Sequence, residues 1–349
     1  MSKWKRIIGV LVAIFAISAR PLLNHLLWLQ KAPPDEKVGV IPILSNKDLS
    51  SLVSGKNALL IGGTRGVGFG TAQALAKAGA HVTIVGRSKD SGERAVSKIQ
   101  DVCGASGSVV DFVQGDIGTV CSALELVDRL ASRDRRYDLA VVSAGIFPDW
   151  TRPLQNEDGI DKSIAITVVG RFLVYRNMHR FMNDGARILN VLNSGDKLPP
   201  SAGLFDRDII EGKRDVTSLI EAGMNFGIGE EIMMDSLFRY DESYTNRKFT
   251  MVSTHPGILD TDLLNGQGVL VDILFKITVP LVGISVEDCG VLQSSILVSE
   301  KLHQFGLTLV DHFGYGRIRD PAFADLIEQH RDWLWKFLTA MEVGPSCGK

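Results

Sequence analysis

The feature that most limits how this chain can fold is the stretch Asn57–Gly70, with the sequence NALLIGGTRGVGFG. An apolar run, Ala58–Ile61, predicts a short buried strand, and Phe69–Ala78 has the pattern of an alanine-rich helix. The turn between them contains Gly62, Gly66 and Gly68. A strand that reverses into a helix so abruptly needs glycine, because a Cβ would obstruct both the turn and any approaching phosphate. Since the helix N-terminus also offers unpaired N–H groups, the stretch predicts a dinucleotide-binding turn.

The next strand, His81–Val85, bears on the kind of dinucleotide. It ends in Gly86, Arg87 and Ser88. In such folds the end of this strand lies beside the adenine ribose, where an acidic side chain suits a 2′-hydroxyl and an arginine suits a 2′-phosphate. Arg65, within the glycine turn, can add a second positive charge. Each arginine alone is also typical of a solvated surface, but their joint placement favours NADP(H) over NAD.

Strands and helices continue to alternate along the chain. Further strands are predicted at Val109–Val113, Leu139–Val142, Arg187–Leu192 and Phe249–Thr254. This alternation is typical of a parallel sheet covered by helices on both faces. We therefore expect an α/β fold, a Rossmann-like doubly wound parallel sheet in a single domain.

Four segments in order make the chain similar to the short-chain dehydrogenase/reductase family, and in particular to its membrane-anchored, retinol-dehydrogenase-like branch. They are the Gly62–Gly68 turn, the pair Asp116 and Ile117, the turn Ser143–Gly145, and His255–Gly257 followed by Thr261. The chain departs from the family at Ile61, where threonine is usual, and at Ser143, where asparagine is usual. The resemblance runs from about residue 55 to about residue 341.

The resemblance implies a set of cofactor-binding residues. They are Gly62, Thr64, Arg65, Gly66, Val67, Gly68, Arg87, Asp116, Ile117, Ala144, Gly145, Pro256, Gly257 and Thr261.

The resemblance also locates the family's catalytic pair, a tyrosine that exchanges a proton with the substrate oxygen and a lysine that lowers the pKa of that tyrosine. Counting back from His255 by the family spacing places Phe226 at the tyrosine position and Glu230 at the lysine position. A phenyl ring has no ionisable proton, and a glutamate would raise the pKa of a neighbouring acid. We expect the usual pair to be absent, while Glu230 can still accept hydrogen bonds from the nicotinamide ribose.

The two remaining catalytic positions differ from the family as well. The serine that orients the substrate aligns with Asn193, next to Ser194, and the helix asparagine aligns with Thr167. Either Asn193 or Ser194 can still bind a carbonyl, whereas a threonine holds a water less extensively. A proton for the substrate would then come from water, from Ser194 or from Asp196.

A literal Tyr-x-x-x-Lys occurs at Tyr244–Lys248, immediately before the strand Phe249–Thr254. That position is at the end of the sheet opposite to the carboxyl ends of the strands, where ligands bind. We therefore interpret Tyr244–Lys248 as an exposed polar loop and not as a catalytic motif.

Composition limits the remaining possibilities. The chain has 349 residues, is 45% hydrophobic and carries a net charge of −2, which allows one substantial core and gives no basic excess for nucleic acid. Its four cysteines are Cys103, Cys121, Cys289 and Cys347. Their spacing is typical neither of a metal site nor of a disulfide scaffold, so we expect no metal and incidental thiols, as in a reducing compartment.

The N-terminus differs in character from the rest. Basic residues precede the apolar run Ile7–Ala19, and a second apolar piece, Leu22–Leu29, follows. A signal anchor, a cleaved signal peptide and an interfacial hairpin all fit this pattern. We favour an anchor in the endoplasmic reticulum or another endomembrane, because related enzymes carry one; the basic flank then tends to stay cytoplasmic. The expected organisation is residues 1–30 as anchor or signal segment, 31–51 as linker, 52–342 as the dehydrogenase-like domain, and 343–349 as tail.

Two apolar segments follow the His-Pro-Gly landmark. Gly268–Ile284 is placed to cap a hydrophobic substrate or touch lipid, although a packed core helix fits equally. Pro321–Met341 predicts an amphipathic closing helix.

Two functional classes remain. The first is a membrane-associated, NADP-dependent oxidoreductase that acts on a hydrophobic carbonyl or alcohol with a rearranged proton donor. The second is a pseudoenzyme that binds the nucleotide as a sensor or as an interaction protein. The sequence does not indicate an oligomeric state.

Overall fold

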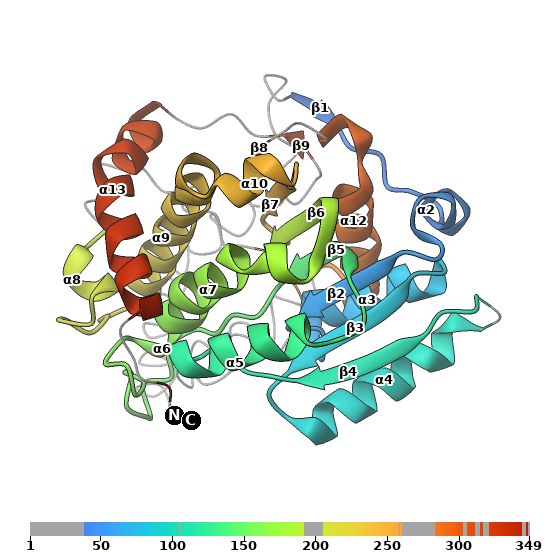
Figure 1. Cartoon of the computed structure of the whole chain (residues 1–349), viewed down its shortest axis with the longest axis horizontal. Helices are drawn as coiled ribbons and strands as arrows, with labels where there is room; N and C mark the ends of the chain where they lie inside the picture. The colour runs from blue at the N-terminus through green and yellow to red at the C-terminus, as the bar shows by residue number, and fades with distance from the viewer. Residues whose placement is uncertain are drawn as a thin grey trace, which may run out of the picture.

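The computed structural model describes residues 38–104, 106–191, 205–257, 259, 283–302, 306–310, 315–316, 321–343 and 347. Within these residues the chain builds a nine-stranded sheet between layers of helices (Figure 1). The strands are β1 Val38–Val40, β2 Asn57–Ile61, β3 His81–Gly86, β4 Val110–Gln114, β5 Tyr137–Val142, β6 Met182–Val191, β7 Thr250–Thr254, β8 Gly306–Val310 and β9 Tyr315–Gly316. Their spatial order is β1-β9-β8-β7-β6-β5-β2-β3-β4.

Strands β2 to β8 pair in parallel, whereas β9, near one edge, pairs antiparallel with both β8 and β1. The chain moves outward from β2 to β3 and β4 and then crosses to β5 on the other side of β2. This arrangement confirms the predicted doubly wound parallel sheet.

The helices are α2 Asn46–Val53, α3 Gly66–Lys77, α4 Lys89–Cys103, α5 Val120–Ala131, α6 Lys162–Ile164, the π-helix η1 Ala165–Gly170, α7 Arg171–Arg176, the 3₁₀ helix η2 Met178–Arg180, α8 Arg207–Ile210, α9 Leu219–Tyr240, α10 Glu242–Asn246, α12 Val286–Val298, the 3₁₀ helix η6 Glu300–Leu302 and α13 Pro321–Val343. Helix α3 begins at Gly66, earlier than the predicted Phe69, because the Phe69 amide already donates a helical hydrogen bond to the Arg65 carbonyl at 3.3 Å.

Apolar side chains point alternately to the two faces of the sheet, so each face has a separate hydrophobic core. In β2, Leu59 and Ile61 belong to the core with α5, α7, α9 and α13, whereas Ala58 and Leu60 belong to the core with α2, α3, α4 and α12. Successive strand side chains point to opposite faces, so a strand buried on both faces reads as a continuous apolar run.

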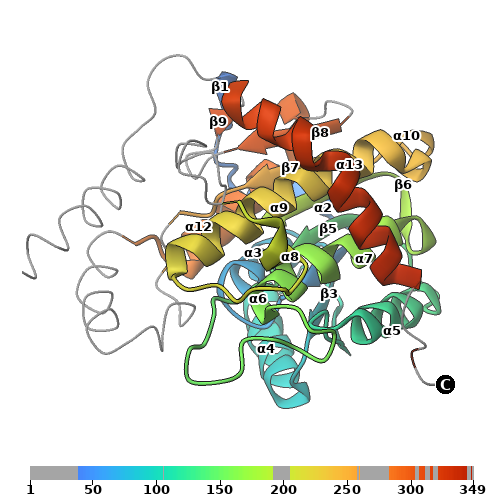
Figure 2. The ribbon, with the colours of Figure 1, turned by 90° about the vertical axis from the view of Figure 1, so that its left-hand side faces the viewer.

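The C-terminal helix closes the first of these cores. Helix α13 packs against α9 (Figures 1 and 2). The Trp335 ring meets Phe172 edge to face at 5.6 Å between centroids, and Arg331 Nε lies 2.6 Å from Asp235 Oδ2. The predicted closing helix is confirmed.

The interpretation of Tyr244 as part of an exposed loop is wrong. Tyr244 lies in α10 and is fully buried, with its ring against Phe238 and Phe249. Its hydroxyl donates a hydrogen bond to the Tyr175 carbonyl at 3.0 Å. The large Tyr244 ring fills space in the core just before β7. Burial of this ring decides its position, although the residues next to it in the sequence are polar. Its position away from the carboxyl ends of the strands agrees with the prediction.

The expectation of incidental thiols is wrong for two of the four cysteines. Cys121, in α5, forms a disulfide with Cys347, whose Cα lies 5.3 Å away. The two are separated by 226 positions in the sequence, so no local spacing pattern could reveal the pair. Cys103 and Cys289 are free.

Among the residues that the structure describes, no helix is both long and apolar enough to cross a bilayer. The predicted anchor in residues 1–30 lies outside the described residues.

We expect Cys121→Ser to lower the free energy of unfolding by about 2–5 kcal/mol, because the native crosslink restricts the unfolded chain over a very long loop. Thermal unfolding without reductant measures the change, and Cys103→Ser is the matched control. Peptide mapping of protein alkylated at cell lysis should find Cys121 joined to Cys347. A Cys121→Ser variant as stable as the parent, together with free Cys121 in that map, would contradict the crosslink.

Candidate functional site

The order of the sheet defines where a ligand can bind. Connections leave β2 and β5 in opposite directions, so the carboxyl ends of these neighbouring strands form the topological switch point. In open parallel sheets, ligands bind in the crevice that opens at this point. The glycine turn follows β2, and the Ser143–Gly145 turn follows β5, so both line this crevice.

The glycine turn lies directly against the turn after β5. A Cβ on Gly62, whose φ is +93°, would lie 2.5 Å from Ala144 N, and a Cβ on Gly68 would lie 2.4 Å from Ser143 Oγ. The Ser143 and Ala144 amides both donate to the Ile61 carbonyl, at 2.9 and 3.1 Å. Glycine is therefore required at both positions for the two turns to touch.

The N-terminus of α3 opens at this contact. Its N-cap residue, Arg65, makes no capping hydrogen bond with its side chain. The first N–H groups of a helix need an external partner, and a phosphate is a suitable one. The turn thus has the backbone geometry of a pyrophosphate site.

The remaining cofactor positions lie around the same end of the sheet. Thr64 is close to β3, since a Cβ on Gly86 would lie 2.5 Å from Thr64 Cγ2, and both Arg65 and Arg87 are exposed. Asp116 Oδ1 accepts from the Gly118 amide at 3.0 Å, which holds the turn after β4. The other described positions in this group are Gly66, Val67, Ile117, Gly145, Pro256 and Gly257. Thr261 lies outside the described residues.

The family's catalytic positions are only partly described. Thr167 lies in the π-helix η1, where it is buried and its hydroxyl donates to the Ser163 carbonyl at 2.5 Å. That hydroxyl proton is therefore used within the helix itself. Asn193, Ser194 and Asp196 lie outside the described residues, as does most of Gly268–Ile284.

An apolar contact occupies the position predicted to align with the family's tyrosine. Phe226 is 5% exposed, and its ring meets Phe147 edge to face at 5.5 Å between centroids. The two rings place no hydroxyl at this position. The side chain at position 226 can shape a pocket for an apolar substrate, but it cannot donate a proton.

The position predicted to align with the family's lysine is occupied by Glu230, which is one member of a buried ion pair. Glu230 is completely buried, and its Oε1 accepts from Arg171 Nη1. Arg171 is 2% exposed and begins α7. The positive charge at this end of the sheet therefore comes from α7, and its partner on α9 is negative.

Burial and the ion pair act on Glu230 in opposite directions. Desolvation raises the pKa of Glu230 to about 7, and the nearby Arg171 charge and hydrogen bond work against that rise. Burial also raises the pKa of Tyr175 well above its ordinary value, so this phenol stays neutral.

The analysis of the sequence did not single out Arg171. A signal was nonetheless present, because AITVVGRFLV contains one charge in an apolar helical run, and Glu230 follows Gly229 in another. Charged side chains are almost never fully buried unless they are paired. Two opposite charges in two apolar helices therefore indicate an ion pair.

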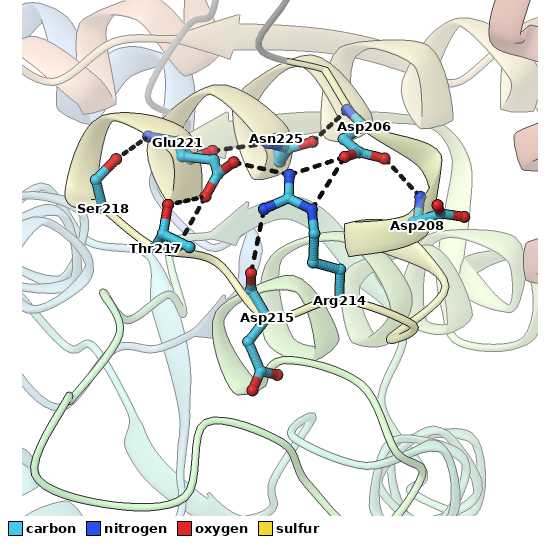
Figure 3. A network of polar contacts seen from close by, with 8 residues as sticks. All are labelled: Asp206, Asp208, Arg214, Asp215, Thr217, Ser218, Glu221 and Asn225. Atoms are coloured by element: carbon cyan, nitrogen blue, oxygen red, sulfur yellow. Dashed lines mark hydrogen bonds and ion pairs between the residues drawn. The ribbon is translucent and has the colours of Figure 1, made fainter.

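Polar contacts fix the segment that leads into α9 (Figure 3). Arg214 Nη2 lies 2.8 Å from both Asp206 Oδ2 and Glu221 Oε1. Asn225 Oδ1, on α9, accepts from the Asp206 amide at 2.8 Å. The start of the helix that carries both substituted family positions is therefore held in place by charges around a single arginine.

The chain is similar to known oxidoreductases. Residues 56–200 match a family model described as short chain dehydrogenase. A protein of Streptomyces sp. (strain C5) that bears the name of a daunorubicin C-13 ketoreductase is 28% identical over 227 residues, which are 64% of this chain and 71% of that protein. A short-chain dehydrogenase/reductase of Pestalotiopsis microspora is 30% identical over 138 residues, or 39% of this chain, and the match spans only about half, 51%, of that relative.

Solved structures show the same fold. A short chain dehydrogenase from Burkholderia cenocepacia J2315 in complex with NADP has a TM-score of 0.55 and 22% sequence identity, over 75% of this chain and 98% of that one.

We expect Glu230→Gln to change how stability depends on pH. The folded-state pKa of Glu230, about 7, exceeds its ordinary value of 4.5, so the folded state binds more protons between these values. The stability that Glu230 contributes is therefore present at low pH and is lost as pH rises through 7. The free energy of unfolding of Glu230→Gln minus that of the parent should therefore increase as pH rises from 5 to 8, whatever constant cost the substitution carries, as measured by thermal unfolding.

Glu221→Gln is the matched control with the opposite sign. Arg214 lowers the pKa of Glu221, so the carboxylate stabilises the fold at neutral pH and loses that effect as pH falls. A stability difference between Glu230→Gln and the parent that stays constant across the range would show that Glu230 does not titrate there.

Proposed function

The chain belongs to the short-chain dehydrogenase/reductase family of oxidoreductases, and on that premise we propose that it uses NADP(H) to interconvert a hydrophobic carbonyl and its alcohol. The observation that carries the proposal is the contact between the glycine turn and the Ser143–Ala144 turn, beside an α3 N-terminus without a side-chain cap. When bound, the nicotinamide supplies or accepts the hydride.

The preference for NADP(H) rests on two arginines. Arg65 is the N-cap residue of α3, and Arg87 directly follows β3, at the two sides of the expected ribose position. Both side chains are exposed. The Arg87 carbonyl accepts from Gln114 Nε2 at 3.0 Å, which anchors the backbone and leaves the guanidinium to meet a 2′-phosphate.

The proposed active site is atypical in its proton donor. Phe226 has no proton to give, and Glu230 is engaged with Arg171. The proton on the substrate oxygen would come from water or from the segment after β6, where Ser194 and Asp196 stand in the sequence. Phe147 and Phe226 provide an apolar wall suited to a hydrophobic substrate.

One observation favours a second candidate function. The buried Arg171–Glu230 pair replaces the charge arrangement that activates the family's tyrosine, while the dinucleotide crevice keeps its geometry. A protein that binds NADP(H) without turnover, as a sensor or an interaction protein, has these properties.

We further propose that the domain faces the lumen of an endomembrane compartment, to which the N-terminal segment anchors it. The Cys121–Cys347 disulfide supports this location, because disulfides persist in oxidising compartments. The basic residues that precede Ile7–Ala19 also support it, because such a flank tends to stay cytoplasmic and sends the following domain across.

We expect the full-length protein to bind NADPH more tightly than NADH, and Arg87→Glu to remove this preference by placing a negative charge beside the 2′-phosphate. Titration followed by nucleotide fluorescence measures both affinities. Arg94→Glu is the matched control, since Arg94 is an exposed arginine within α4. Equal binding of the two nucleotides by the parent would contradict the assignment of NADP(H), and binding of neither would contradict the proposed function.

Turnover separates the two candidate functions. We expect the parent to oxidise NADPH when apolar ketones or aldehydes are added. Its rate should lack the acceleration of roughly 100- to 10,000-fold that general acid–base catalysis contributes. Phe226→Tyr should change the rate little, because Glu230 cannot replace the lysine, and Phe147→Tyr is its control. A parent that binds NADPH but shows no carbonyl-dependent oxidation would favour the sensor.

A further inference from the structure

Arg171 makes more contacts than its ion pair requires. Its Nε and Nη2 both donate to the Ala144 carbonyl, at 3.1 and 2.8 Å. Its Nη1 donates to the Val191 carbonyl at 2.8 Å and to Asn190 Oδ1 at 2.9 Å, in addition to Glu230 Oε1. All three nitrogens of one guanidinium are therefore used, on acceptors from three different parts of the fold.

These acceptors lie where the crevice is formed. Ala144 is in the turn after β5, and Val191 is the last residue of β6. Backbone carbonyl groups that are buried need hydrogen-bond donors. Arg171 supplies those donors and joins the ends of two adjacent strands.

The contact with Ala144 leads on to the glycine turn. Ala144 lies so close to Gly62 that a Cβ there would come within 2.5 Å of its amide nitrogen. The carbonyl group of the same residue, Ala144, accepts a hydrogen bond from Arg171. A shift of the Ala144 peptide would therefore move the surface against which the pyrophosphate turn lies.

The network extends to one more strand. Asn190 Oδ1 also accepts from the Tyr175 hydroxyl, and Asn190 Nδ2 donates to Ser253 Oγ, on β7, at 3.2 Å. Asn190 and Tyr175 are fully buried. Inside a protein each member of such a network orients the others, so Arg171 is held in a single position.

Neutralising Glu230 would not by itself require an arginine. A lysine could balance the carboxylate, but it has a single nitrogen and no planar fork to bind separate carbonyls together. The contacts with Ala144 and Val191 do not involve Glu230. The geometry of the guanidinium, and not only its charge, is therefore what this position uses.

We propose that Arg171 is a positioning residue whose guanidinium joins the carboxyl ends of β5 and β6 to α9 and thereby holds the dinucleotide crevice in its binding shape. The expected effect of Arg171 on NADPH affinity rests on the proposed function. Its expected effect on the turn after β5 does not.

Two single variants separate the fork from the charge. Arg171→Lys keeps a cation beside Glu230 and loses the fork, whereas Glu230→Gln keeps the fork and an acceptor and loses the negative charge. The first readout is hydrogen exchange, without nucleotide, of the Ser143 and Ala144 amides that donate to Ile61. The second is the affinity of the full-length protein for NADPH.

In Arg171→Lys we expect both amides to exchange about tenfold faster or more, and the NADPH dissociation constant to rise about tenfold or more. In Glu230→Gln, read by exchange alone, both amides should exchange near the parent rate. The double variant Arg171→Met with Glu230→Met leaves no unpaired buried charge, so it remains folded and gives the same result as Arg171→Lys if the latter does not fold.

Parent-like exchange and affinity in the variants without the fork would overturn the proposal. Equally accelerated exchange in Glu230→Gln and Arg171→Lys would overturn it too, because the charge would then be the cause. If the parent binds no NADPH, the proposed function fails, and the exchange of Ser143 and Ala144 still decides the role of Arg171.

Discussion

The close approach of two backbone turns is the constraint on which this structure depends. The turn after β2 and the turn after β5 meet with no room for a Cβ at Gly62 or Gly68. This contact is possible only because β2 and β5 are parallel neighbours whose carboxyl ends lie at the same edge. The crevice, the open N-terminus of α3 and the place of the expected pyrophosphate all follow from it.

Charge at the catalytic end of the sheet is arranged differently from the family pattern. A buried ion pair contributes little net stability, because desolvation of both ions offsets their attraction. Removing one partner is nevertheless costly, since the other remains charged and unsolvated. Arg171 and Glu230 are therefore best explained by geometry: the pair fixes α7 against α9, and the same guanidinium holds two strand ends.

Long-range contacts close the fold around this centre. Helix α13 covers α9 through aromatic rings and the Arg331–Asp235 pair. The Cys121–Cys347 bond then ties the chain beyond α13 back to α5. The core that α9 shares with the sheet is thus closed by elements from the far end of the chain.

The sequence by itself determined the features that arise between near neighbours. The apolar run, the glycines and the following helix lie within Asn57–Lys77, so their pattern indicates both the turn and its ligand class. The spacing of ordered motifs also predicts that Phe226 and Glu230 align with the family's catalytic pair, and this alignment stays a prediction. Only the tertiary structure decided that Arg171 pairs with Glu230 across 59 positions, that Tyr244 is buried, and that Cys121 meets Cys347. Such contacts leave no local periodicity, because they depend on the order in which the strands assemble into the sheet.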